Sequence, residues 1–207
     1  GCLSLTQIFI PSTVLSIGDY SFSGCSNLVE VSIPSSLNSI GTNSFENCSS
    51  LRKIYCLHSI DSIKDSTFSG CFSLNKFAFP RYVKYIGQYS FYGCSFTKII
   101  IPNSVTSIGE YAFKKCSNLI EVLIPSSVKS IGIGAFSECS SIQQINLPNS
   151  ILKINNKVFY KCSSLIEVEM PASLNSIGEY AFSECTELKQ VFFPPNLTMI
   201  GKYSFSY

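Results

Sequence analysis

Apolar and polar residues follow a pattern that returns about every 23 residues along the chain. The clearest copy is CSNLIEVLIPSSVKSIGIGAFSE, from Cys116 to Glu138. With its cysteine counted as the first place, apolar residues occupy the fourth, seventh, ninth, thirteenth, sixteenth and twenty-first places. Because one copy is too short to bury its own apolar face, we expect the copies to stack as one solenoid domain over residues 1–207. The nine copies begin at Cys2, Cys25, Cys48, Cys71, Cys94, Cys116, Cys139, Cys162 and Cys185.

The seventh and ninth places alternate with mostly polar neighbours. This period of two predicts a strand of about four residues, such as 121–124, with one face buried. Proline occupies the tenth place in eight of the nine copies. It ends the strand because it has no N–H for a ladder. We therefore expect short strands that pair in parallel from copy to copy.

The second half of each copy carries isoleucine at the sixteenth place, and glycine follows in seven copies. We expect residues 128–131 and their counterparts to be extended, as a second narrow sheet. The glycine permits either a positive φ or a close approach of the neighbouring coil. Phenylalanine occupies the twenty-first place in all nine copies. GEYAF fits one helical or 3-10 turn that needs packing, and the nine rings predict an aromatic spine.

Cysteine is frequent, with ten in 207 residues, and nine of them hold the first place of a copy. A cysteine at one fixed place predicts an in-line stack of buried thiols, because free cysteine packs as a small hydrophobe. Cysteines of neighbouring copies would lie about 4.8 Å apart, near the lower limit of the Cα–Cα separation in a disulfide. A few disulfide bonds therefore remain an alternative.

The motif Leu119-x-x-Val122-x-Ile124 matches the LxxLxL strand of leucine-rich repeats. With IPSSVKSIG and AF before the next cysteine, the unit resembles the BspA-like subclass over essentially the whole chain. The resemblance implies an α/β repeat solenoid: a right-handed superhelix with a parallel concave sheet and short extended or 3-10 segments on the convex side. Serine replaces the usual corner Asn or Cys, and its hydroxyl is expected to bond the corner backbone, at Ser36, Ser104, Ser127 and Ser173.

The resemblance also implies a cell-surface or secreted protein that takes part in adhesion and recognition. Neither end of the chain has a polar capping repeat, so we expect a piece of a longer array with weak end-to-end self-association. No run of 18 apolar residues occurs, and we expect no direct membrane insertion by this segment.

The copies that depart from the consensus direct attention to residues 48–98, which hold seven basic and two acidic residues. Lysines at the sixth place are expected to lie in adjacent strands, where like charges repel, so selection for an acidic ligand is one explanation. The other is that exposed lysine keeps the sheet soluble. Outward apolar residues at Ile100, Leu123 and Phe192 also favour a protein contact, and the alternative is that they are isolated and carry no function. The candidate ligand-binding residues are Lys53, Tyr55, Lys76, Arg81, Tyr82, Lys98, Ile100 and Leu123.

Catalysis and metal binding find little support in the residues. The chain has one histidine, His58, and Cys56-x-His58 would supply two metal ligands without a second pair at zinc-site spacing. Glu167 and Glu169 point the same way from one strand, but on an open sheet a carboxylate pair is usually polar surface. We expect no enzyme, no cofactor and no metal. The net charge of +2 does not point to a polyanion, and we expect no nucleic-acid partner.

Three functions remain as hypotheses. The first is a surface module that binds a protein or glycan through the concave sheet. The second is a cytoplasmic scaffold that uses the same face for protein partners, which reduced thiols would favour. The third is a structural spacer, which the uneven outward columns of the sheet disfavour.

Overall fold

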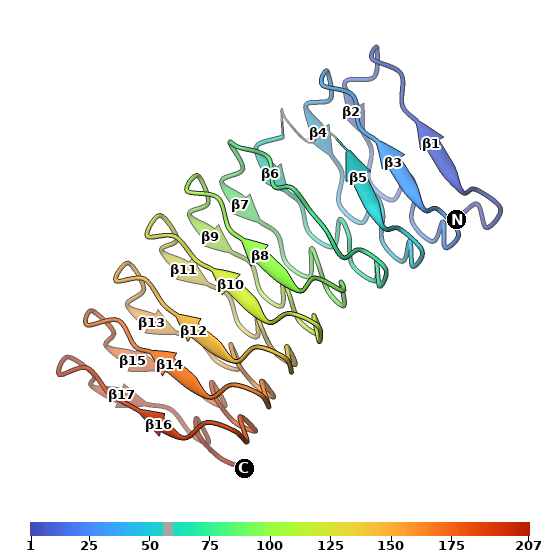
Figure 1. The fold of residues 1–207 in the computed structure, drawn as a ribbon. Helices are drawn as coiled ribbons and strands as arrows, with labels where there is room; N and C mark the ends of the chain where they lie inside the picture. The colour runs from blue at the N-terminus through green and yellow to red at the C-terminus, as the bar shows by residue number, and fades with distance from the viewer. Residues whose placement is uncertain (56–59) are drawn as a thin grey trace.

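The computed structural model describes residues 1–55 and 60–207. The repeats form successive coils of one parallel β-solenoid, which run in a single row from one end of the molecule to the other (Figure 1). Paired strands lie in exact copy-to-copy register, as Gln7 opposite Glu30 and Glu167 opposite Gln190 show. The repeat period therefore sets which residues become neighbours across coils. No helix in the described residues is long and apolar enough to span a membrane.

The first series of strands follows the fourth place of each copy. Val122 is 4% exposed, whereas its neighbours Glu121 and Leu123 point outward, as the period of two predicts. The strands of this series are β1 (Gln7–Phe9), β3 (Glu30–Ser32), β5 (Lys53–Tyr55), β8 (Lys98–Ile100), β10 (Glu121–Leu123), β12 (Gln144–Asn146), β14 (Glu167–Glu169) and β16 (Gln190–Val191).

This sheet is interrupted, which the repeat pattern did not predict. Its ladders are β1-β3-β5, β8-β10 and β12-β14-β16. In the coil from Cys71, residues 75–79 form no strand. Phe77 and Phe79 occupy the inward places there, with ring centroids 4.8 Å and 5.6 Å from that of Phe91. The two rings stand in place of the aliphatic side chains usual there, but the ladder is also interrupted between β10 and β12, where aliphatic residues face the core.

The second, narrow series was predicted correctly. Its strands, two residues long, are β2 (Ser16–Ile17), β4 (Ser39–Ile40), β6 (Ser62–Ile63), β7 (Tyr85–Ile86), β9 (Ser107–Ile108), β11 (Ser130–Ile131), β13 (Lys153–Ile154), β15 (Ser176–Ile177) and β17 (Met199–Ile200). Where glycine follows this isoleucine its φ is not positive, and in every such copy except the first it serves the close approach of the preceding coil. A Cβ on Gly132 would lie 2.4 Å from the backbone nitrogen of Glu110 in the preceding coil.

The third side of the coil is formed by the residues around the spine phenylalanines. The α/β expectation was wrong here, because the described residues contain no helix and no 3-10 segment. The nineteenth and twenty-third places have positive φ, for example Tyr111 at 55° and Lys115 at 62°. A right-handed turn cannot continue through such residues. Instead, alternate N–H groups donate to the next coil, as Phe113 does to the carbonyl of Ala135 at 2.8 Å. This side is therefore a ladder of turns.

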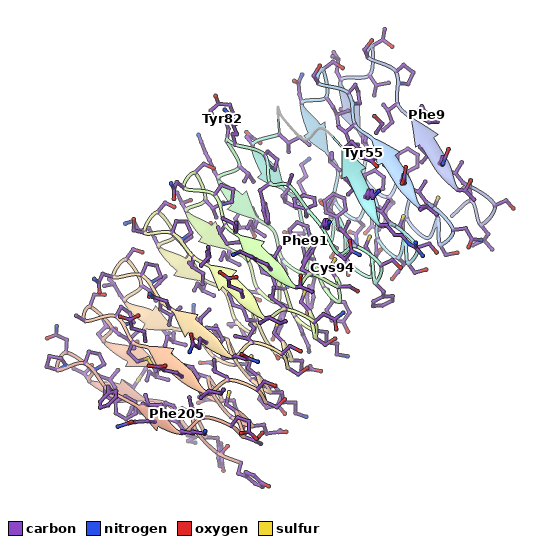
Figure 2. The ribbon with its side chains drawn as sticks, viewed as in Figure 1. Phe9, Tyr55, Tyr82, Phe91, Cys94 and Phe205 are labelled. Carbon is purple, nitrogen blue, oxygen red and sulfur yellow. The ribbon has the colours of Figure 1, made fainter. Side chains whose placement is uncertain are left out.

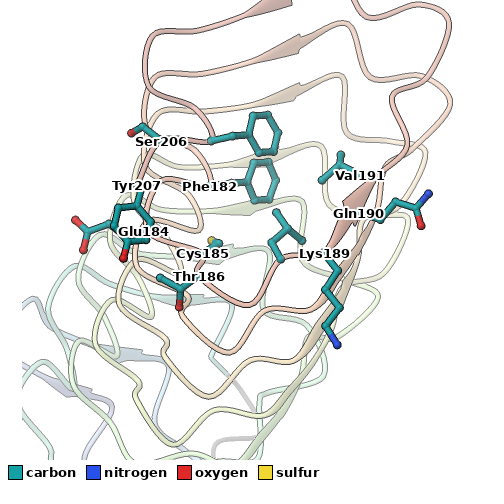
Figure 3. A pocket seen from close by; sticks show the side chains of 11 residues that line it. Phe182, Glu184, Cys185, Thr186, Lys189, Gln190, Val191, Ser206 and Tyr207 are labelled. Atoms are coloured by element: carbon teal, nitrogen blue, oxygen red, sulfur yellow. The ribbon is translucent and has the colours of Figure 1, made fainter.

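The C-terminal coil leaves part of its interior open. A hollow of about 220 Å³ lies beside Phe182, Cys185 and Phe205, with Glu184 and Tyr207 at its rim (Figure 3). Only part of its lining, including Phe182, Cys185 and Phe205, occupies places that are core in the preceding coils. We assign it no ligand.

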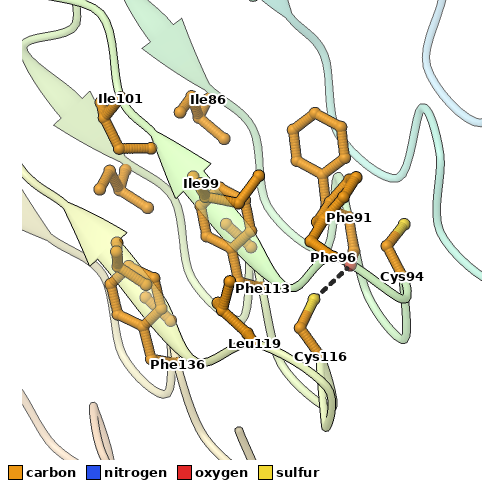
Figure 4. Close-up of a cluster of buried hydrophobic side chains, with 14 of the residues drawn as sticks. Ile86, Phe91, Cys94, Phe96, Ile99, Ile101, Phe113, Cys116, Leu119 and Phe136 are labelled. Carbon is orange, nitrogen blue, oxygen red and sulfur yellow. Dashed lines mark hydrogen bonds between the residues drawn. The ribbon is translucent and has the colours of Figure 1, made fainter. Parts of the chain in front are cut away.

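The core consists of ladders of apolar side chains from the same place of each copy, and the phenylalanine, isoleucine and cysteine ladders are of one residue type. The spine phenylalanines stack with neighbouring ring centroids 5.2–5.9 Å apart from Phe22 to Phe205, as predicted. Phe96 takes the leucine place of the short copy and packs 5.6 Å from Phe91 (Figure 4). Sequence reasoning missed this residue because the missing position shifts the count.

The cysteine ladder is buried and reduced over most of its length. The nine cysteines that the structure describes are free. The thiol of Cys116 donates to the carbonyl of Phe91 at 3.2 Å (Figure 4), and Cys139 repeats this contact with Phe113 at 3.1 Å. Burial raises the thiol pKa of Cys139, and it raises that of Cys48 to about 12. These thiols are inert packing groups.

The corner serines divide into two groups. Ser36 and Ser173 donate to the carbonyls of Val14 and Ile151, both at 3.1 Å, as expected. Ser104 and Ser127 have buried hydroxyl oxygens without a hydrogen-bond partner in the described structure, so the expectation was wrong for them.

Candidate binding surface on the strand face

The strand face is the surface formed by the outward side chains of the sixth and eighth places. On β8, Ile99 is 2% exposed and packs into the core. Lys98 and Ile100 therefore point outward, and Ile100 is 58% exposed. Ile100 lies in register with Leu123 of β10, which is 46% exposed. The two residues form a small apolar step in the middle of the strand face.

A hollow of about 830 Å³ lies where the sheet is interrupted, and we name it the basic hollow. It is open to the side of the strand face, between the coil from Cys71 and the coil from Cys94. Three of its side chains are cationic, those of Lys76, Arg81 and Lys98. Its lining residues are Asn75, Lys76, Phe77, Ala78, Phe79, Arg81, Thr97, Lys98, Ile100 and Pro102.

The cations of this region differ in their partners. Lys98 Nζ lies 2.8 Å from Glu121 Oε2, and Lys53 Nζ lies 3.9 Å from Glu30 Oε1. Lys76 and Arg81 form no ion pair with any residue that the structure describes. Lys76 also differs from expectation, because its coil forms no strand there and the three lysines do not share one ladder. The basic hollow thus offers two uncompensated cations.

The eight candidate residues do not form one site. The basic hollow brings together four of them, Lys76, Arg81, Lys98 and Ile100. Lys53 and Tyr55 are exposed on β5, outside the lining, and Tyr82 is 70% exposed at an outer corner (Figure 2). Leu123 lies on β10, in register with Ile100, and lines a second hollow instead.

That second hollow has the opposite charge, and we name it the acidic hollow. It encloses about 370 Å³ where β10 and β12 are not paired. Glu167 and Glu169 line it together with Glu121. Since both glutamates of β14 are exposed, the carboxylate pair noted in the sequence is polar surface here. The strand face therefore changes from basic to acidic between β8 and β10.

Sequence reasoning missed a third feature, a charged trough of about 710 Å³ along the turn side. Lys115, Glu138, Lys161 and Glu184 alternate in sign at the twenty-third place of successive coils, each with φ near 60°. Lys161 pairs with Glu184 at 3.5 Å, and Lys115 lies over the ring of Tyr92 at 5.6 Å from its centroid. The alternation of lysine and glutamate at the twenty-third place is the sequence signal from which this trough could have been predicted. Glu138 pairs with Lys114 beside the trough at 3.2 Å, so each of the four charges has a partner on the turn side, and we assign the trough no ligand.

Two residues considered for metal binding, Cys56 and His58, lie outside the described residues. Within residues 1–55 and 60–207, no group of three or more His, Cys, Asp or Glu side chains is placed to hold a metal ion.

A family model described as the BspA type leucine-rich repeat region, with six copies, matches residues 1–120 and 106–207. The chain belongs to the BspA-type leucine-rich repeat family. A leucine-rich repeat protein from Bacteroides ovatus is similar to this BspA-type chain at 36% identity and a TM-score of 0.91, over 97% of this chain. The chain spans about half of that protein, 54% of its length.

Two further solved structures share the fold of the BspA-type chain. The leucine-rich repeat protein of T. pallidum is 27% identical with a TM-score of 0.62, over 90% of this chain and 79% of that one. The pneumococcal vaccine antigen PcpA is 21% identical with a TM-score of 0.61, over 95% and 65%. At that identity the second likeness concerns the fold alone. No curated protein matches the chain.

Proposed function

We propose that this BspA-type chain is a non-enzymatic interaction module that binds a protein or glycan ligand through the strand face, as part of a cell-surface or secreted protein. The observation that carries the proposal is the basic hollow, where Lys76 and Arg81 have no acidic partner among the described residues. Cations without a partner at the rim of a hollow favour an acidic ligand, because opposite potentials speed encounter and suppress wrong partners. The surface location rests on the family resemblance.

The test compares a double variant, Lys76→Glu with Arg81→Glu, with the unchanged chain. The matched control is Lys153→Glu, because Lys153 is exposed on β13 of the other sheet. We expect the double variant to lose binding to sulfated oligosaccharides or to acidic protein by at least about tenfold, while the control binds normally. Equal binding by all three proteins would contradict the proposal.

A second candidate is an intracellular scaffold that uses the same face. The observation in its favour is that the nine described cysteines are free. The two candidates differ in compartment and not in chemistry. Localisation of the full-length protein on intact cells, by protease accessibility of this domain, separates them, since only a surface protein is cleaved without lysis.

A further inference from the structure

The main chain at the basic hollow is unpaired on the side where a ladder would run. Between β8 and β10, the N–H of Ile101 donates to the carbonyl of Leu123 at 3.0 Å, and the N–H of Ile120 donates to that of Thr97 at 2.9 Å. No hydrogen bond of this kind joins residues 75–79 to β8 across the hollow. Among the described strands, β8 pairs with β10 and with no other. An edge strand therefore lies open within the array.

An open edge presents unpaired N–H and C=O groups at the spacing of a β-ladder, which is a template for another extended chain. β8 is three residues long, so the open edge spans about 10 Å at the usual strand rise. The rings of Phe77 and Phe79 contribute apolar surface to the hollow, and Lys76 and Lys98 stand on its two sides. Main-chain donors and acceptors, an apolar lining and cations thus meet in one place.

We propose that the basic hollow binds an extended acidic peptide segment of a partner protein by strand addition. The peptide backbone pairs with the open edge of β8 and with residues 75–79. Side chains of an extended peptide alternate in direction. Apolar residues therefore face Phe77 and Phe79, and the carboxylates between them reach Lys76, Arg81 and Lys98. This inference rests on the proposed function and names the class of its ligand.

The unpaired main chain favours a peptide over a glycan. A sulfated glycan would neutralise the cations, but it offers no row of alternating N–H and C=O groups to match the edge of β8. In strand addition, main-chain hydrogen bonds supply affinity and pockets for alternate side chains supply specificity. Glycan binding is therefore kept as an outcome of the test.

The experiment titrates the protein with the peptide acetyl-Glu-Val-Glu-Val-Glu-amide and with the same peptide methylated on the backbone nitrogens of both valines. Methylation keeps every carboxylate and removes two main-chain donors. A peptide with lysine in place of glutamate controls for apolar binding. We expect the N-methylated peptide to bind at least about tenfold more weakly and the lysine peptide not to bind. Since the change is made in the peptide, the fold of the protein is not at risk.

Hydrogen exchange gives a second readout on the unchanged protein. The amides of Phe77 and Phe79 should exchange rapidly in the free protein and slow by at least about tenfold with the peptide bound, while the amide of Val168 on β14 stays protected throughout. Protection of Phe77 and Phe79 in the free protein would show a closed edge and overturn the inference.

The outcomes separate this inference from the proposed function. Equal binding of the methylated and unmethylated peptides, or binding of a sulfated oligosaccharide without binding of the peptide, overturns strand addition and leaves the acidic-ligand module standing. If neither the peptide, nor a sulfated oligosaccharide, nor an acidic protein binds, both proposals fall.

Discussion

Lys98 and Glu121 face each other in register on β8 and β10, with Lys98 Nζ 2.8 Å from Glu121 Oε2. Lys98 lines the basic hollow, and Glu121 lines the acidic hollow. The pair therefore stands at the boundary between surfaces of opposite charge. Because both side chains are about half exposed, the contact contributes little to stability, on the order of 0.2–1 kcal/mol.

Removing the charge of Glu121 should strengthen binding of an acidic ligand. In Glu121→Gln, Lys98 loses its competing carboxylate, and we expect about two- to fivefold tighter binding of the acidic peptide. Glu30→Gln is the control, because it frees Lys53, which lies outside the lining of the hollow. Titration at low salt checks both variants. An equal gain in both would mean that net charge, and not the position of Lys98, sets the affinity.

The aromatic spine predicts a gradient of stability along the array. Phe113 is fully buried, with ring centroids 5.4 Å from those of Phe91 and Phe136. Phe113→Ala should lower the free energy of unfolding by about 3–5 kcal/mol, as is usual for a buried phenylalanine. Phe205→Ala should cost less, because Phe205 is 38% exposed and its spine neighbour is Phe182 alone. Urea unfolding of both variants measures the difference, and equal losses would contradict it.

The two glycines Gly132 and Gly18 occupy the same place in different coils and should respond differently to alanine. A Cβ at Gly132 would lie 2.4 Å from the backbone nitrogen of Glu110, which cannot move away without disturbing a coil. We expect Gly132→Ala to destabilise the protein by at least about 2 kcal/mol. At Gly18 the nearest contact is Ser21 Oγ at 3.4 Å, so Gly18→Ala should stay within about 1 kcal/mol of the parent. Thermal unfolding of the pair checks this.

The buried thiols predict a loss of stability at alkaline pH. Burial raises the thiol pKa of Cys48 and of Cys185 to about 12, above the ordinary value near 9. Below about pH 8 the thiols are protonated in both states, and their contribution is fully present. As the pH rises from 9 towards 12, the unfolded chain releases protons that the folded chain keeps. The free energy of unfolding then falls by about 1.4 kcal/mol per pH unit for each such thiol.

The control for this prediction is Cys139→Ala, since burial also raises the thiol pKa of Cys139. Its unfolding free energy, followed under reducing conditions between pH 8 and 11, should decline less steeply by about 1.4 kcal/mol per pH unit. Parallel curves for the variant and the parent would show that the thiol of Cys139 does not contribute to the alkaline loss and would contradict the prediction.

The sequence predicted the parts of the coil that repeat. Phe113 and Ile131 belong to places that carry the same residue in every copy, Val122 belongs to a place that is apolar in every copy, and all three are buried. A side chain at a fixed place of a stacked repeat meets its own counterpart, so the pattern specifies the neighbour as well as the element. For the same reason the narrow sheet and the cysteine ladder followed from the sequence.

The structure places four of the eight candidate residues around the basic hollow. The sequence does not show why these four share one hollow. The hollow lies where residues 75–79 form no strand and where Phe77 and Phe79 replace the usual aliphatic core residues. The number of uncompensated cations depends on which lysine reaches a glutamate, and Glu121 reaches Lys98 while none of the described acidic residues reaches Lys76. Such contacts depend on side-chain reach across coils, which a repeat pattern leaves undetermined.

By itself, the sequence determined the parallel β-solenoid, its core places and its aromatic spine, because burial at a period of 23 residues leaves one way to stack the copies. Only the tertiary structure decided that GEYAF turns carry positive φ at Tyr111 in place of a helical turn, and that the sheet opens beside β8. Both depend on hydrogen bonds between coils, where the partner of each backbone group lies one coil away and not along the chain.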